Sequence, residues 1–173
     1  MSSPPQQNLN KDLTDFLEII DNHLKNKIIL VAAGGTAMTL LDLKSSTIDI
    51  DFTGPQKDIE EFRTICNSIP HGKKIDTWFD GVVFSQFLPE DYIKKSIAIK
   101  TSLKNIDLRA LHPVDIIVTK IGRLNSRDKE DIRMCIRRYS LSRDNIKERA
   151  KYVKENLPGN KLIYEENLKF LDL

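Results

Sequence analysis

A short β-branched run that ends in two adjacent glycines is the feature that most constrains this chain. Lys27–Ala33 has the length and composition of one buried strand, and Gly34-Gly35 follows it directly. Apolar residues at helical spacing then resume over Thr36–Leu43. The order of strand, tight turn and helix predicts a chain that mixes strands with helices.

A second predicted strand, Thr47–Phe52, has strictly alternating side chains. One face carries Ile48, Ile50 and Phe52, and the other carries Asp49 and Asp51. Gly54-Pro55 closes this strand. The alternation predicts one face against the core, with both carboxylates on the other face.

The remaining apolar pattern predicts a small sheet surrounded by helices. We expect further strands over 74–79, 82–87 and around 97–99 and 106–111, and helices from Asn10, over 56–68, from Pro113, around 132–139, and over 142–156 and 160–171. The fold class is therefore α+β, with a mixed sheet and a helical C-terminal segment. We expect a disordered tail at 1–8, a core at 9–111 and packed helices at 112–173, all in one domain.

Composition and cysteine usage limit the class of protein. With 40% apolar and 30% charged residues among 173, the chain is neither disordered, collagen-like nor a coiled coil. Cys66 and Cys135 stand far apart in no metal-binding spacing, which favours reduced thiols in a cytoplasmic protein. No apolar run reaches the length of a membrane span, so we expect no membrane partner.

Asp49 and Asp51 form the first part of a candidate chemical site. Residues i and i+2 of a strand project side by side, about 6.5–7 Å apart at their Cα atoms. Two carboxylates at this spacing repel each other unless a divalent cation lies between them, and Mg²⁺ prefers oxygen ligands. The pair therefore favours a magnesium site.

The glycine turn supplies a second part. Gly34 and Gly35 carry no side chain, so the backbone and the N–H groups that open the next helix can approach a phosphate closely. The Thr36 hydroxyl extends the same turn. A phosphate-binding turn beside carboxylates suits a nucleoside triphosphate with bound Mg²⁺. A dinucleotide-binding fold is disfavoured, because no GxGxxG motif follows the strand.

These residues resemble the signature of the DNA polymerase β-like nucleotidyltransferase superfamily. Gly34-Gly35 is followed, after 13 residues, by Asp49-Ile50-Asp51. The stretches 108–120 and 127–132 are also similar to a region of the small nucleotidyltransferases related to AbiEii abortive-infection toxins. Together, the glycine–aspartate signature and this later region cover about residues 28–135.

The resemblance implies a fold, a reaction and a set of roles. It implies a mixed sheet with helices against it, and a two-metal transfer of a nucleoside monophosphate from a nucleoside triphosphate to a hydroxyl. Gly34, Gly35 and Thr36 would hold the triphosphate, while Asp49 and Asp51 would bind Mg²⁺. Asp76 would be the third carboxylate, bridging a metal and helping to deprotonate the hydroxyl. Asp107 is the alternative for that position, because it also has the apolar-Asp-apolar pattern of a strand.

Lysine 120 has two interpretations. Lys120 could reach the β- and γ-phosphates, or it could pair with Asp131 as a structural charge. His112 precedes Pro113, which favours a role beside a helix cap over that of a general base.

The charge distribution leaves two functional hypotheses open. Residues 120–155 carry twelve Lys and Arg against six Asp and Glu. This excess suits an enzyme whose acceptor is tRNA, another RNA or a partner protein. It also suits an inactive nucleotidyltransferase fold that binds RNA or a cognate toxin or antitoxin. It is equally typical of solvated helix faces that bind no partner.

Overall fold

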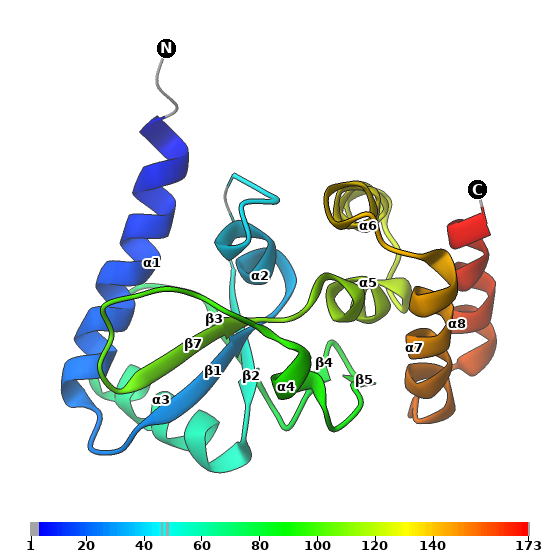
Figure 1. Cartoon of the computed structure of the whole chain (residues 1–173). Helices are drawn as coiled ribbons and strands as arrows, with labels where there is room; N and C mark the ends of the chain where they lie inside the picture. Colours follow the sequence, from blue (N-terminus) through cyan, green and yellow to red (C-terminus); the bar gives the residue numbers. More distant parts are fainter. Residues whose placement is uncertain (1–3, 46, 48, 173) are drawn as a thin grey trace.

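Five strands form one mixed sheet in the computed structural model, which describes residues 4–45, 47 and 49–172 (Figure 1). The strands are β1 (Ile28–Ala32), β2 (Ile50–Gly54), β3 (Ile75–Phe79), β6 (Ile97–Ala98) and β7 (Ile106–Ala110). Their order is β3-β2-β1-β7-β6. The β1–β7 and β2–β3 pairs are parallel, and the β1–β2 and β6–β7 pairs are antiparallel. The predicted α+β class is confirmed.

Helices flank the sheet and make up the C-terminal third of the chain. They are α1 (Pro4–His23), α2 (Gly34–Leu40), α3 (Gln56–Ser68), α4 (Tyr92–Lys95), α5 (Pro113–Ile121), α6 (Ser126–Tyr139), α7 (Arg143–Glu155) and α8 (Lys161–Leu168), with a 3₁₀ turn over Lys169–Asp172. None of the helices in the described ranges is both long enough and apolar enough to cross a membrane.

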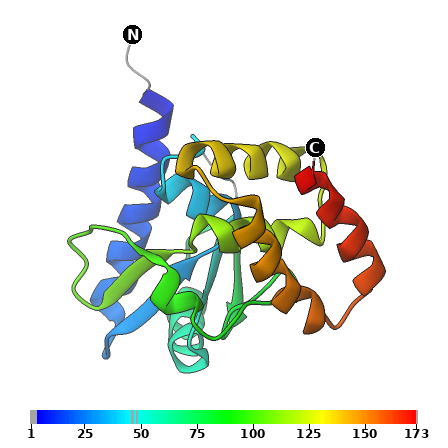
Figure 2. The ribbon, with the colours of Figure 1, turned by 45° about the vertical axis from the view of Figure 1, so that its right-hand side comes forward.

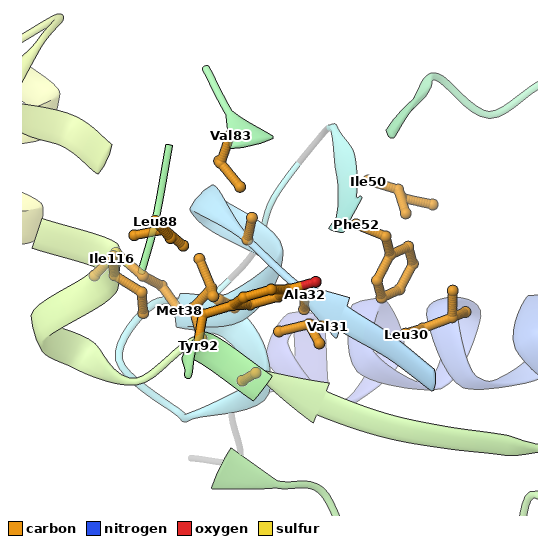
Figure 3. Close-up of a cluster of buried hydrophobic side chains, with 14 of the residues drawn as sticks. Leu30, Val31, Ala32, Met38, Ile50, Phe52, Val83, Leu88, Tyr92 and Ile116 are labelled. Carbon is orange, nitrogen blue, oxygen red and sulfur yellow. The ribbon is translucent and has the colours of Figure 1, made fainter. Parts of the chain in front are cut away.

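The two faces of the sheet have different neighbours because side chains alternate along each strand. Phe52 points toward α3, where its ring meets the ring of Phe62 edge to face with centroids 5.6 Å apart. The hydrophobic core also includes buried side chains from β1, β2, α2, α4 and α5 (Figure 3). Asp51, the neighbour of Phe52 in the chain, therefore lies on the opposite face.

Helix α5 is the centre of the C-terminal segment. It contacts α2, α6, α7 and α8, and the four C-terminal helices lie together beside one end of the sheet (Figures 1 and 2). The Tyr164 hydroxyl donates to the Val118 carbonyl at 2.9 Å, and the Asn167 amide donates to the Ile121 carbonyl at 2.7 Å. These bonds fix α8 on α5. Helix α5 is therefore held between α8 on one side and α2, which lies against the sheet, on the other.

Several predicted elements differ in extent from those observed. Helix α1 begins at Pro4 and not at Asn10, because proline is compatible with the first turn of a helix. The predicted strand 82–87 is a hairpin of β4 (Val82–Val83) and β5 (Gln86–Phe87). Strand β2 begins at Ile50 and not at Thr47, so Asp49 lies in a bend before the strand. Ile48, expected on the buried face, lies outside the described residues.

Candidate active site

Asp51 and Asp76 are direct neighbours on adjacent strands. They pair in register in the parallel β2–β3 ladder, so their side chains share one face of the sheet. Asp51 is only 5% exposed, whereas Asp76 is half-buried. Burial and the charges of Asp76 and Asp49 raise the pKa of the Asp51 carboxyl to about 7. The negative charges of the three predicted carboxylates therefore act on one another.

Asp49 reaches the same region from the bend, and not from the strand face that the alternation predicted. Its backbone carbonyl accepts hydrogen bonds from the hydroxyls of Thr36 at 3.0 Å and Thr47 at 2.9 Å. These two bonds turn the chain before β2 begins. The Asp49 carboxylate stays half-exposed, with the Lys74 ammonium 3.7 Å away.

The glycine turn lies against these carboxylates. Gly34 has a φ of +52°, and a Cβ at this position would lie 2.8 Å from Oδ2 of Asp51. A Cβ at Gly35 would lie 2.7 Å from Oγ1 of Thr47. Contacts this short are not tolerated in folded proteins without a shift of the neighbour. A side chain at either glycine would therefore displace a neighbouring side chain, and at Gly34 it would also strain the backbone.

Thr36 is placed differently from what the sequence suggested. Its side chain is fully buried, and its hydroxyl donates to the Asp49 carbonyl and accepts from the Asp51 N–H at 3.0 Å. The hydroxyl thus holds the two ends of the Asp49–Asp51 segment. The structure gives Thr36 a positioning role behind the carboxylates, with no surface toward a triphosphate.

The carboxylates line a cavity of about 360 Å³. Half of its ten other lining residues are cationic, and these cations come from the α2–β2 loop, the residue before β3, α5, the α5–α6 connection and the start of α6. The lining consists of Asp49, Asp51, Asp76, Asp131, Lys44, Lys74, Lys120, Arg123, Arg127, Gly35, Thr47, Phe84 and Asn125. Acidic and basic groups thus face each other across a space of the size that binds small molecules.

Lys120 lies in this lining but is almost fully buried. Its ammonium is 3.0 Å from Asp131 and 3.4 Å from Asp128. Asp131 also receives the Lys44 ammonium at 3.2 Å, and the Arg123 guanidinium binds both oxygens of Asp128 at 2.8 Å. The structural pairing with Asp131 is therefore present. Lys120 adds positive charge to the cavity, and this charge lowers the pKa of Asp51 against the larger effect of burial.

Several lining residues, among them Lys44, Lys74 and Phe84, were absent from the sequence-based prediction. Lys74 could have been found, because the alternation that places Asp76 on one face of β3 extends back to residue 74. Lys44 and Phe84 gave no such signal. The Phe84 ring packs against Trp78, with centroids 4.9 Å apart, and against the Arg123 guanidinium at 4.8 Å, contacts that depend on the tertiary structure.

Asp107 and His112 lie elsewhere. Asp107 pairs in register with Ile29 on β1. The N–H of Ala33, just after the other end of β1, donates to the Asp51 carbonyl. Ile29 lies about 13 Å along the strand from Ala33, so Asp107 is far from Asp51. The Asp107 carboxylate is half-exposed and lies 3.5 Å from Arg109. His112 is the N-cap of α5, as expected from its position before proline.

The donor set determines which metal ion the site could hold. No group of three His, Cys, Asp or Glu side chains in the described part of the chain is arranged as a ready metal cluster. Asp49, Asp51 and Asp76 nevertheless share one cavity, offer only oxygen ligands, and carry like charges that raise the pKa of Asp51. A hard divalent cation such as Mg²⁺ would compensate those charges, so the residues fit this ion.

Comparison with known proteins identifies the family. No curated protein and no solved structure matches the chain. A family model described as "Nucleotidyltransferase of unknown function (DUF6036)" matches residues 8–166, which include every predicted site residue. The chain therefore belongs to this family of nucleotidyltransferases.

Proposed function

We propose that the protein is a Mg²⁺-dependent enzyme that transfers a nucleoside monophosphate from a nucleoside triphosphate to a hydroxyl of a nucleic acid or a protein. The observation that carries this proposal is the in-register pair of Asp51 and Asp76 beside a cavity rich in lysine and arginine. Family membership supports it, because the family is named for this class of transfer.

Each group in the cavity has a role in this proposal. Asp49, Asp51 and Asp76 would hold two Mg²⁺ ions, with Asp51 the most enclosed of the three. Gly35 lines the cavity where the triphosphate would approach, and the buried Gly34 keeps the turn close to Asp51. When bound, the ions would neutralise phosphate charge and favour ionisation of the acceptor hydroxyl.

The reaction exchanges one phosphorus–oxygen bond for another. The acceptor oxygen bonds to the α-phosphorus, and the bond from that phosphorus to the pyrophosphate oxygen breaks. Asp76 helps to remove the hydroxyl proton. Its carboxylate is less buried than that of Asp51 and is therefore more accessible to the acceptor hydroxyl. Lys120, Lys44 and the arginines around the cavity stabilise the charge that grows on the departing pyrophosphate.

Labelled nucleotides test this proposal. The full chain is incubated with Mg²⁺ and each nucleoside triphosphate labelled at the α-phosphate, together with tRNA, other RNA and protein acceptors. We expect an acceptor to be labelled by the α-label and not by a γ-label, because the γ-phosphate leaves in pyrophosphate. The Asp49→Asn/Asp51→Asn variant should label nothing, whereas Asp107→Asn should label normally. Equal behaviour of the wild type and the double variant with every acceptor would reject the proposal.

The resemblance to AbiEii-like proteins supports a narrower role as one component of a toxin–antitoxin pair. In that role, induced expression of the wild type should arrest growth, and the Asp49→Asn/Asp51→Asn variant should not. Co-expression of the product of the adjacent gene should restore growth.

A binding function without catalysis is the second candidate. It is favoured by the cations on the outer side of α6, where Lys129 and Arg133 lie over the Phe170 ring at 5.7 and 5.0 Å. RNA binding that ignores Mg²⁺ and falls steeply with salt would support this candidate. Stabilisation by a nucleoside triphosphate that requires both Mg²⁺ and Asp51 would support the enzyme.

A further inference from the structure

A second, larger cavity lies at the opposite end of α5 from the candidate active site. Its volume is about 670 Å³, within the range of about 300–1,000 Å³ typical of small-molecule sites. The start of α5, the end of α4, the α6–α7 loop and α7 surround it. Its lining residues are Pro89, Lys95, His112, Val114, Ser140, Leu141, Ser142, Asn145, Glu148, Arg149 and Tyr152.

The two cationic side chains of this cavity differ in their partners. The Arg149 guanidinium binds both oxygens of the fully buried Asp115 at 2.6 and 2.9 Å, and it reaches Asp91 at 2.7 Å. Arg149 is therefore fixed and largely neutralised. Lys95 has no carboxylate within ion-pair distance among the residues that the structure describes, so its charge is available to a ligand.

His112 presents a defined hydrogen-bond donor. Its Nδ1 accepts the Val114 N–H at 3.1 Å, so in the neutral ring the proton is on Nε2. Burial and the charges of Lys95 and Arg149 lower the pKa of this imidazole. The ring therefore lies in a positive environment, although Glu148 also lines the cavity.

Neutral polar groups and one aromatic ring complete the lining. The side chains of Ser140 and Asn145 are exposed, and the Ser142 hydroxyl accepts the Asn145 N–H at 3.4 Å. Tyr152 is 38% exposed and offers a flat apolar surface. The set thus combines a free ammonium, an imidazole N–H, hydroxyls and an aromatic face.

We propose that this cavity binds a small phosphate-bearing ligand of about nucleotide size. Lys95 and the Nε2–H of His112 bind the phosphate oxygens, which accept several hydrogen bonds at once. Glu148 and the serine hydroxyls bind the hydroxyl groups of the ligand, and Tyr152 packs against its apolar part. The site is separate from the Asp51 cavity, so the proposal stands independently of the transfer reaction.

The histidines of the full chain provide the test. Inorganic phosphate, AMP and adenosine are titrated without Mg²⁺ while the imidazole signals of His23, His71 and His112 are followed by NMR over pH. We expect phosphate and AMP to raise the pKa of His112 by about half a unit or more, because a bound anion favours the imidazolium. The other two histidines should not change, and adenosine should bind much more weakly than AMP.

Two matched lysine variants locate the contact. Lys95→Gln should weaken AMP binding about tenfold, the usual effect of losing one charge-assisted bond. Lys94→Gln, on the exposed side of the same helix and outside the lining, should bind AMP like the wild type. Equal melting temperatures establish that both variants are folded.

Four results would overturn the proposal. They are an unchanged His112 at saturating AMP, equal shifts at all three histidines, full AMP affinity in Lys95→Gln, and adenosine binding as tight as that of AMP. Phosphate binding as tight as that of AMP would overturn the proposed nucleotide size of the ligand, because no part beyond the phosphate group would then be bound.

Discussion

Gly34 lies so close to the Asp51 carboxylate that a Cβ at this glycine would be 2.8 Å from Oδ2. The same Cβ would come 3.1 Å from the Phe84 ring. The turn after β1, the most buried of the three predicted carboxylates and the tip of the β4–β5 hairpin thus form one packed unit. The glycine turn therefore shapes the candidate active site directly.

Substitution of Gly34 by alanine should destabilise the protein by about 2–4 kcal/mol. An L-residue at φ +52° costs about 1–2 kcal/mol, and the contact with Asp51 adds to that cost. The free energy of unfolding, measured in denaturant, should fall accordingly. Stabilisation by a nucleoside triphosphate should also weaken, because Asp51 must move.

Alanine substitutions at two other glycines allow the backbone cost and the contact cost to be measured separately. Gly72 also has a positive φ, of +63°, but a Cβ there would meet nothing within 4 Å, so Gly72→Ala should cost only about 1 kcal/mol. Gly159→Ala meets no neighbour, and its effect should lie within about 1 kcal/mol of zero. A Gly34→Ala variant no less stable than Gly72→Ala would contradict the close contact with Asp51.

Removal of the Asp51 charge should stabilise the protein at high pH. Its pKa is about 7 in the folded state against 3.8 for the ordinary carboxyl, so the folded state holds the proton more tightly. The wild type therefore loses stability as pH rises from about 4 to about 7. Asp51→Asn cannot ionise, and at pH 8 it should exceed the wild type by about 2–4 kcal/mol.

The pH dependence of this difference provides the check. Unfolding free energies of the wild type and Asp51→Asn should converge as pH falls toward 4. A difference that stays constant between pH 5 and pH 8 would show that burial and the charges of Asp76 and Asp49 do not raise the pKa of Asp51.

The sequence predicted most elements because glycine, proline and alternation mark them locally. The glycine turn after β1 and the β-prone run Ile75-Asp76-Thr77-Trp78 are such local signals. Asp49 was misplaced for the opposite reason. Its bend depends on the Thr36 hydroxyl, which is distant in the chain, while the local alternation is typical of a strand.

Strand order and the cationic half of the cavity could not be predicted locally. The register of Asp51 with Asp76 depends on β2 and β3 pairing across a whole helix. Lys44 meets Asp131 across 87 residues of chain. Such contacts follow from tertiary packing, about which the spacing of residues in one sequence says little.

Mg²⁺ should distinguish the two candidates for the third carboxylate. In the wild type, Mg²⁺ with a nucleoside triphosphate should raise the free energy of unfolding by about 1.4 kcal/mol when the triphosphate concentration is ten times its dissociation constant. Asp76→Asn should lose this gain, because Asp76 faces Asp51 in the cavity. Asp107→Asn should keep it, because Asp107 lies outside the lining. Thermal unfolding of both variants, with and without Mg²⁺, measures this stabilisation. If only Asp107→Asn loses it, Asp107 and not Asp76 is the third carboxylate.

Replacement of Lys120 by methionine should destabilise the fold by about 2–4 kcal/mol. The change leaves Asp131 and Asp128 nearly buried with one cation fewer, although Lys44 and Arg123 still compensate part of their charge. Lys147→Met is the control, because its pair with Asp172 is about half exposed and should contribute less than about 1 kcal/mol. Denaturant unfolding at pH 7 measures both variants. If Lys120→Met retains full stability but loses nucleotide binding, Lys120 serves the triphosphate and not the helix pairing.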